Sequence, residues 1–294
     1  MRHIRQKLRI AIVLLALGPA AAICGEPATL FARVDTDTRD APRALQLAIA
    51  TYVPQDGDEL LRVDLVSAIH IGDPSYYAEL NRRFEDYDAL LYELVAPENA
   101  VATNRLAKRK GFISGAQIGM TKLLDLSFQL EEINYDKANF VHADLTPQQL
   151  RDSMDERGES LYVYFWRIFF ASLDQYAKDP LGLKDWEMLS AVLSTEQDDA
   201  FKTMIAYEMT NIEQIQDVLG EDSGSAVIGA RNQRAVDVLK REIDAGAKRI
   251  GIFYGVAHMP DLEERLLDQL GLTYDSTEWI DAWQLGSGTA SEAP

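Results

Sequence analysis

The stretch Ala247-Lys248-Arg249-Ile250-Gly251-Ile252-Phe253-Tyr254-Gly255-Val256-Ala257-His258-Met259-Pro260 decides the fold of this chain. Its apolar run, residues 250–254, predicts a short strand buried on both faces of a sheet. Gly255 permits backbone conformations that a side chain would resist. His258 follows, and Pro260-Asp261 then opens a helical pattern. The sequence therefore predicts a histidine on a strand-to-helix turn, at the carboxyl edge where open α/β sheets bind ligands.

Residues 1–24 have the pattern of an export signal. A basic start precedes the apolar residues 10–17 and a small-residue end at residues 20–24, so we expect cleavage near residues 22–25. The apolar stretch is shorter than the about 20 residues that span a bilayer. A lipid anchor on Cys24 is less favoured, because Ile23 is a poor residue before a lipidated cysteine.

The charge and cysteine content narrow the function classes. Without the four basic residues of the signal, the chain holds 25 basic and 47 acidic residues. Such a surface repels phosphates, so nucleic acids and anionic lipids are not expected partners. The single cysteine, Cys24, allows no disulfide within the chain and no cysteine nucleophile in the mature protein. An exported, acidic protein without disulfides is typical of a bacterial periplasm.

The rest of the chain divides around the quoted stretch. Residues 25–43 are expected to be a tether, and residues 44–97 a first α/β half. In that half, runs at 44–53 and 60–71 predict a hairpin. A helix that begins after Pro74 and a strand at 89–95 then complete a βαβ unit with parallel strands.

Residues 98–222 are expected to be a helical insertion that covers the sheet edge. Within it, residues 123–130 suggest a helix, residues 139–145 are expected to be extended, and residues 146–149 form a capping box. The apolar residues 161–173 are too short to span a bilayer, and they are the best candidate for a dimer or membrane-surface contact.

Residues 223–286 form the second α/β half in this prediction. A helix opening at residues 230–234 leads into the strand at Ile250, and residues 279–285 suggest an edge strand. Residues 287–294 are expected to be a disordered tail. The predicted fold is thus α/β, with a mixed, mainly parallel sheet of two related β-α halves and a central helical insertion over its carboxyl edge.

Three histidines of the mature chain, His70, His142 and His258, each stand beside a predicted strand end. The βαβ unit should bring His70 and Glu93 to the same edge of neighbouring strands. Histidine nitrogens with a carboxylate suit a divalent transition metal such as zinc, manganese or cobalt, and the candidate ligands are His70, Glu93, His142 and His258. His142 could equally be an ordinary polar residue at a strand-to-helix turn.

Other readings of these residues stay open. Glu93 lies inside an apolar run, so it should not be buried unpaired, and a salt bridge with Arg231 would satisfy it. Arg231 and Asn232 could hold a substrate oxygen, steady Glu93, or simply form a polar first turn. The chain has no Gly-x-Ser-x-Gly elbow and no phosphate-loop spacing.

Taken in order, His70, Glu93, Arg231-Asn232 and Gly255-Val256-Ala257-His258 resemble the motifs of the TraB/PrgY/GumN/Tiki superfamily, which is distantly related to erythromycin-esterase and ChaN-like proteins. The resemblance covers about residues 44–272. One departure is Ser67, where the family has glycine. The resemblance implies an α/β core with a helical cover, and a metal-dependent hydrolase by analogy with the peptide-cleaving Tiki proteases.

These observations lead to one expected function and two alternatives. We expect a periplasmic metal-dependent hydrolase of amide or peptide bonds, in which His70, His258 and His142 hold the ion. Glu93 would be a ligand or the general base, and Arg231 would stabilise the oxyanion. One alternative is a non-enzymatic protein that sequesters a peptide, a signal molecule or haem. The other is a metal-free, esterase-like hydrolase.

Overall fold

The computed structural model describes residues 30–55, 60–96, 127–157, 197–210 and 226–285. Predictions that lie outside these ranges include the signal at 1–24, the first half of the helix at 123–130, the apolar segment 161–173 and the tail at 287–294. No helix in the described ranges is long and apolar enough to cross a membrane.

The core of the molecule is one mixed sheet with the strand order β1-β2-β3-β8-β5-β7, in which β9 also pairs with β2. Among the described strands of this sheet, β2 alone runs against the others. It is antiparallel to β1, β3 and β9, whereas β3, β8, β5 and β7 are mutually parallel. This confirms the mixed, mainly parallel sheet. The strands are β1 (Ala32–Thr36), β2 (Pro42–Pro54), β3 (Arg62–Ala68), β5 (Ala89–Tyr92), β7 (Phe140–His142), β8 (Arg249–Gly255) and β9 (Leu272–Gln284).

Strand β8 lies between β3 and β5, which is where the prediction was wrong. The hairpin of β2 and β3 forms as expected, but β3 and β5 are not neighbours, since β8 pairs with both in parallel. The strand is buried from Ile250 to Tyr254. A Cβ at Gly251 would stand 2.6 Å from Leu90 Cδ1. The apolar run and this close approach explain why β8 lies in the middle of the sheet.

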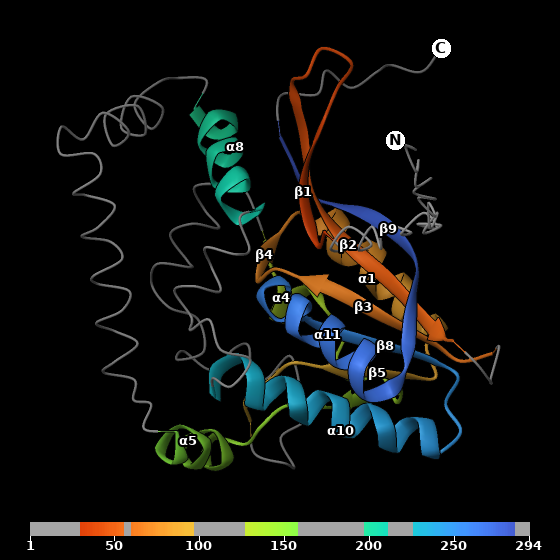
Figure 1. The fold of residues 1–294 in the computed structure, drawn as a ribbon. Coiled ribbons are helices and arrows are strands. Elements are labelled where there is room, and N and C mark those ends of the chain that lie inside the picture. Colours follow the sequence, from red (N-terminus) through yellow and green to blue (C-terminus); the bar gives the residue numbers. More distant parts are fainter. Residues whose placement is uncertain (1–29, 56–59, 97–126, 158–196, 211–225, 286–294) are drawn as a thin grey trace, which may run out of the picture.

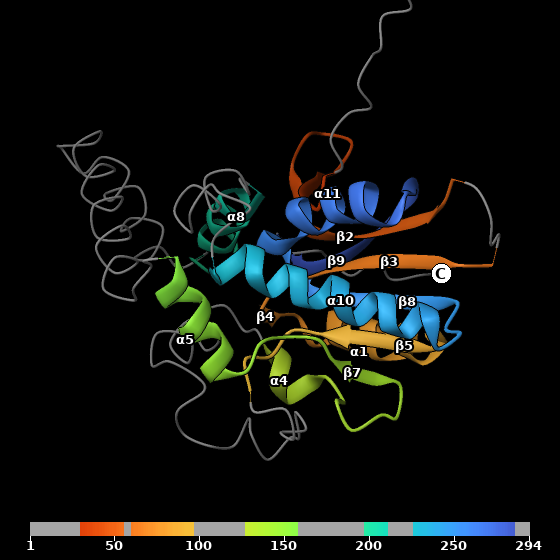
Figure 2. The same ribbon diagram turned by 60° about the horizontal axis from the view of Figure 1, so that its bottom comes forward.

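Helices cover both faces of the sheet (Figures 1 and 2). On one face, α1 (Pro74–Arg83) and the short η1 (Phe84–Asp86) pack through Phe84, whose ring lies 4.9 Å from that of Phe253. On the other lie α10 (Arg231–Asp244) and α11 (Met259–Leu270). Helix α11 ends at Gly271, which adopts the left-handed conformation at φ 62°. The predicted helices at these three places are therefore confirmed.

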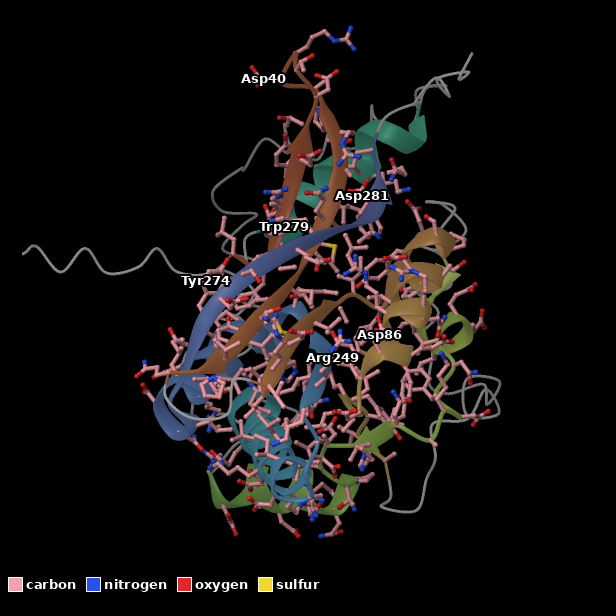
Figure 3. All side chains as sticks on the ribbon, turned by 90° about the vertical axis from the view of Figure 1, so that its right-hand side faces the viewer. Asp40, Asp86, Arg249, Tyr274, Trp279 and Asp281 are labelled. Carbon is pink, nitrogen blue, oxygen red and sulfur yellow. The ribbon has the colours of Figure 1, made fainter. Side chains whose placement is uncertain are left out.

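The predicted tether at 25–43 is wrong for its second part. Strand β1 pairs with the first half of β2, so residues 32–47 form a hairpin arm that extends beyond the body of the sheet (Figure 1). Its turn includes Asp40, with φ 61°, and Figure 3 shows this residue at the tip. The sequence of this segment is polar and irregular because its turn is exposed. In that turn, the backbone N–H groups of Arg39 and Ala41 donate to the carboxylate of Asp37.

The region predicted as a helical insertion also contributes a strand. Residues 140–142 form β7, which pairs in parallel with β5, so they belong to the main sheet. A small second sheet joins β4 (Ile71–Gly72) to β6 (Ser127–Phe128), followed by the short α4 (Gln129–Glu132). Helix α5 (Pro147–Glu156) begins with the predicted capping box of Thr146 and Gln149. Helix α8 (Gln197–Thr210) is tied to the body by Lys202, whose Nζ lies 3.1 Å from Asp73 Oδ1.

Candidate functional site

The carboxyl ends of four parallel strands meet at one edge of the sheet. Because β3, β8, β5 and β7 all run in the same direction, the residues that follow them share this edge. They are His70 after β3, His258 after β8, Glu93 after β5 and Asp144 after β7. Because β8 lies between β3 and β5, His258 lies between His70 on one side and Glu93 on the other.

The loop that carries His70 is held through its backbone. Tyr76 Oη donates to the carbonyl of Ser67, Tyr77 Oη to that of Ile69, and Trp283 Nε1 to that of Ile71. The backbone N–H of Gln129 donates to the carbonyl of His70 itself. The backbone is thereby fixed while the imidazole of His70 stays exposed to solvent.

Glu93 lies one residue beyond β5, between Gly255 and Arg231. Its Oε2 accepts from the backbone N–H of Gly255 at 2.7 Å, and its Oε1 accepts from Arg231 Nη2 at 2.7 Å. The expected reason for Gly255 was wrong, because its φ is −54°, which any residue adopts. A Cβ there would instead stand 3.3 Å from Glu93 Oε2. Gly255 thus allows the carboxylate to approach the strand end.

Arg231 is the centre of the cluster. It is the first residue of α10, directly after the π-helical turn η2 (Ala226–Ala230), a rare feature that often marks functional sites. Besides its bond to Glu93, it makes a two-point contact with Asp144, Nε to Oδ1 at 2.9 Å and Nη2 to Oδ2 at 2.6 Å. The side chain of Asp144 is fully buried. One guanidinium therefore binds two carboxylates.

The electrostatics follow from burial and this pairing. Burial disfavours the charged form of Glu93, but Arg231, His258, the N–H of Gly255 and His70 outweigh it and hold its pKa below the usual range. Burial likewise opposes the charge on Arg231, yet Glu93 and Asp144 raise its pKa further. Glu93 and Arg231 are therefore both charged at neutral pH.

His258 lies against this cluster and is almost completely buried. Its Nδ1 is 2.6 Å from Asn232 Oδ1, and its ring meets that of Tyr254 edge-on at 5.3 Å. Its Nε2 is 3.5 Å from Arg231 Nη1 and 3.6 Å from Glu93 Oε1. Burial lowers the pKa of His258 to about 4, although Glu93 acts in the opposite direction. The imidazole is therefore neutral at pH 7.

His142 does not join this group. It pairs with Tyr92 in the sheet register, and residues in register point to the same face. Its Nε2 lies 2.6 Å from the carbonyl oxygen of Leu94, and its ring contacts that of Tyr92. Glu93 follows Tyr92 in the chain, so its side chain points to the opposite face, where it accepts from Arg231 of α10. The alternation of the strand thus separates His142 from His258.

The guanidinium of Arg231 occupies the place where His258 and Glu93 would share a metal ion. Within the described ranges, no group of three or more His, Cys, Asp or Glu side chains is arranged to hold a metal ion. His258 Nε2 and Glu93 Oε1 are close enough to share a ligand, but the guanidinium of Arg231 already contacts both atoms. A second cation at this place would face the positive charge of Arg231 at short range.

Two residues of the site were missed from the sequence. Asp144 follows a strand end, which is the signal that selected the three histidines, but a strand at 140–142 was not assigned to the sheet. Asp261 was noted only as part of a helix start. It accepts a bond from Asn232 Nδ2 at 2.7 Å and so supports the partner of His258. The salt bridge between Glu93 and Arg231, one of the open readings, is present.

Comparisons of the chain with family models, with curated proteins and with solved structures find no match.

Proposed function

We propose that this chain hydrolyses ester or amide bonds without a resident metal ion, with His258 as the general base and Arg231 as the stabiliser of the oxyanion. One observation carries the proposal. His258 Nε2 and Arg231 Nη1 lie 3.5 Å apart at the sheet edge, so a base and a fixed positive donor are close enough to act on the same carbonyl group.

A count of donors explains why Nη1 is the group that can meet substrate. The Nε–H and both N–H groups of Nη2 point to carboxylates, of Asp144 and Glu93. Among the described residues, Nη1 donates to neither carboxylate and lies 3.5 Å from His258 Nε2. A carbonyl oxygen that becomes negative during attack would accept from Nη1, while the two carboxylates keep the guanidinium in place.

The reaction follows from these positions. His258 Nε2 accepts a proton from water as the water oxygen bonds to the carbonyl carbon, and the carbonyl oxygen becomes an oxyanion beside Arg231. The imidazolium is stabilised by Glu93, 3.6 Å away. When the intermediate collapses, the C–O or C–N bond breaks, and His258 returns the proton to the leaving alcohol or amine. The products are a carboxylic acid and that alcohol or amine.

The substrate class is kept broad in this proposal. Small esters, small amides and peptides all carry the carbonyl that the geometry serves, and the predicted export signal would put the reaction in the periplasm. We do not include nucleic acid, because the acidic composition repels it.

The test is a turnover assay of the purified chain against p-nitrophenyl esters of increasing chain length, anilide amides and a peptide library. His258→Gln is expected to lower kcat by about 10²- to 10⁴-fold, because it removes the base. Arg231→Lys is expected to lower kcat by about 10²-fold, since an ammonium cannot bond both carboxylates and the oxyanion.

His142→Gln is the matched control. It makes the same substitution at a histidine on the other face of the sheet, and kcat is expected to stay within about twofold of wild type. Equal losses in His142→Gln and His258→Gln would contradict the proposed role of His258. An absence of turnover on every substrate, with an intact fold, would favour the alternative of a sequestering protein.

A further inference from the structure

The side chain of Asn232 lies between the imidazole of His258 and the carboxylate of Asp261, in the interior between α10 and α11. Its Nδ2 donates to Asp261 Oδ2 at 2.7 Å and to the backbone carbonyl of His258 at 3.1 Å. Both of these oxygens only accept. The amide therefore has one orientation, because its reversal would set Oδ1 against two acceptors.

Asp261 is itself held in place. Arg265, one turn later on α11, donates to it from Nε at 2.6 Å and from Nη2 at 3.0 Å. The same arginine donates from Nη1 to Gln233 Oε1 on α10 at 2.6 Å. The guanidinium thus ties the two helices together and keeps the Asp261 carboxylate directed at Asn232.

The orientation of the amide fixes the proton of the histidine. With Nδ2 turned to Asp261, Asn232 Oδ1 faces His258 Nδ1 at 2.6 Å. An amide oxygen cannot donate, so Nδ1 must carry the hydrogen. In the neutral ring, Nε2 then keeps its lone pair, and this atom is the one that faces Arg231 and Glu93.

We propose that Asp261 and Arg265 are positioning residues that act through Asn232 to hold His258 in the tautomer with a hydrogen on Nδ1 and a free lone pair on Nε2. The importance of this tautomer for turnover rests on the proposed function, but the tautomer itself does not. A merely structural ion pair between Asp261 and Arg265 would fasten α11 without affecting the imidazole proton.

The first measurement is the long-range ¹H–¹⁵N spectrum of the full chain labelled with ¹⁵N-histidine, recorded at pH 7. The signals of His258 are assigned by their loss in His258→Gln. We expect the shift of a protonated Nδ1 and an unprotonated Nε2. A spectrum with Nε2 protonated in the wild-type protein overturns the proposal, whatever the outcome of any activity assay.

The second measurement asks whether Asp261 and Arg265 act on that tautomer. Asp261→Leu/Arg265→Leu removes both partners, so no buried charge is left unpaired. We expect the Nε2-protonated form of His258 to appear in the spectrum, and kcat to fall about 10-fold with little change in KM. Asp261→Asn, which keeps the size of the side chain, should show the same changes more weakly and serves if the double variant does not fold.

The control is Asp268→Asn, the same change at an exposed carboxylate on the same helix. Its tautomer and kcat should match wild type. The proposal is overturned if the Asp261 variants keep a fully Nδ1-protonated His258. Because the spectrum needs no substrate, its result stays separate from the question of whether the chain is a hydrolase.

Discussion

Two clusters in this molecule each join one arginine to two carboxylates, but one cluster is buried and the other is exposed. In the first, Arg231 bridges Glu93 and Asp144 at the sheet edge, and the exposed fractions of these side chains are 12%, 15% and 0%. In the second, Arg43 bridges Asp35 and Asp281 on the hairpin arm and β9, with exposed fractions of 45%, 27% and 28%. Asp281 is labelled on β9 in Figure 3.

The difference shows what burial adds to an identical set of charges. On the arm, water screens the ions, and such contacts contribute little to stability. At the sheet edge, three charges have lost their water, so each depends on its partners. The buried cluster is also the one beside a neutral histidine. A cluster that is costly to bury and easy to disrupt is the one with a chemical use in our proposal.

Removal of the central arginine should give the largest contrast. Arg231→Met leaves two carboxylates buried without a cation, and we expect a loss of about 3–5 kcal/mol in the free energy of unfolding. Arg43→Met should cost no more than about 1 kcal/mol, because its carboxylates reach water. Urea denaturation of both variants measures the two values. Equal costs would show that burial does not separate the clusters.

The pH dependence of stability separates the clusters next, because only the buried one adjoins a histidine. Glu93, Arg231, Asp144 and Asp261 all act on His258, and its pKa when folded is about 4. The contribution of the neutral His258 to stability is complete above pH 6.5, which is the ordinary pKa that histidine has in the unfolded chain. As the pH falls towards 4, the unfolded chain binds a proton that the folded chain does not, so stability decreases by about 3 kcal/mol.

His258→Gln is the comparison that isolates this effect from the titration of carboxylates. Its free energy of unfolding should fall less steeply than that of wild type between pH 6.5 and pH 4, as followed by urea denaturation at several pH values. Parallel curves would mean that His258 has an ordinary pKa in the folded protein.

A smaller effect should come from the fit between Glu93 and the strand end. Gly255→Ala brings a Cβ to 3.3 Å from Glu93 Oε2, so the carboxylate must shift by a few tenths of an ångström. We expect a loss of about 1 kcal/mol in stability, together with a reduced kcat, because the displaced Glu93 also moves Arg231. Thermal unfolding and the turnover assay measure both. Wild-type values for both would show that the close approach is not needed.

The smallest effect is that of salt. Between 0.05 and 1 M NaCl, the contribution of the Arg43 cluster should decline by a few tenths of a kcal/mol, since exposed charges are screened. The difference in stability between wild type and Arg231→Met should not change over this range. A strong salt dependence of that difference would show that water reaches the buried cluster.

Much of the fold could be predicted from the sequence, because many of its elements follow from local sequence patterns. The apolar run of β8, the leucines of α11 and the capping box at Thr146 depend on neighbouring residues only. The order of the strands in the sheet, by contrast, depends on residues that are far apart in the sequence. Nothing local indicated that β8 would separate β3 from β5, since this choice depends on packing such as that of Gly251 against Leu90.

The candidate site could also be predicted only in part. His258 was found as a histidine at a strand end, and Glu93 as a charge within an apolar run. Arg231 was found at a helix start, as a possible partner of Glu93. Asp144 was missed because its strand was not assigned, and His142 was included because its face of the sheet depends on register with Tyr92. Asn232 was predicted, but its partner Asp261 comes from a contact across two helices.

The most direct test of the central claim is the rate of hydrolysis before and after removal of metal ions. The protein is treated with a strong chelator, its metal content is measured, and kcat is determined on the best substrate with and without added zinc, manganese or cobalt. Because the guanidinium of Arg231 provides the positive charge at the sheet edge, the account predicts an unchanged rate in metal-free protein. A rate that disappears with the metal and returns when one of these ions is restored would contradict it.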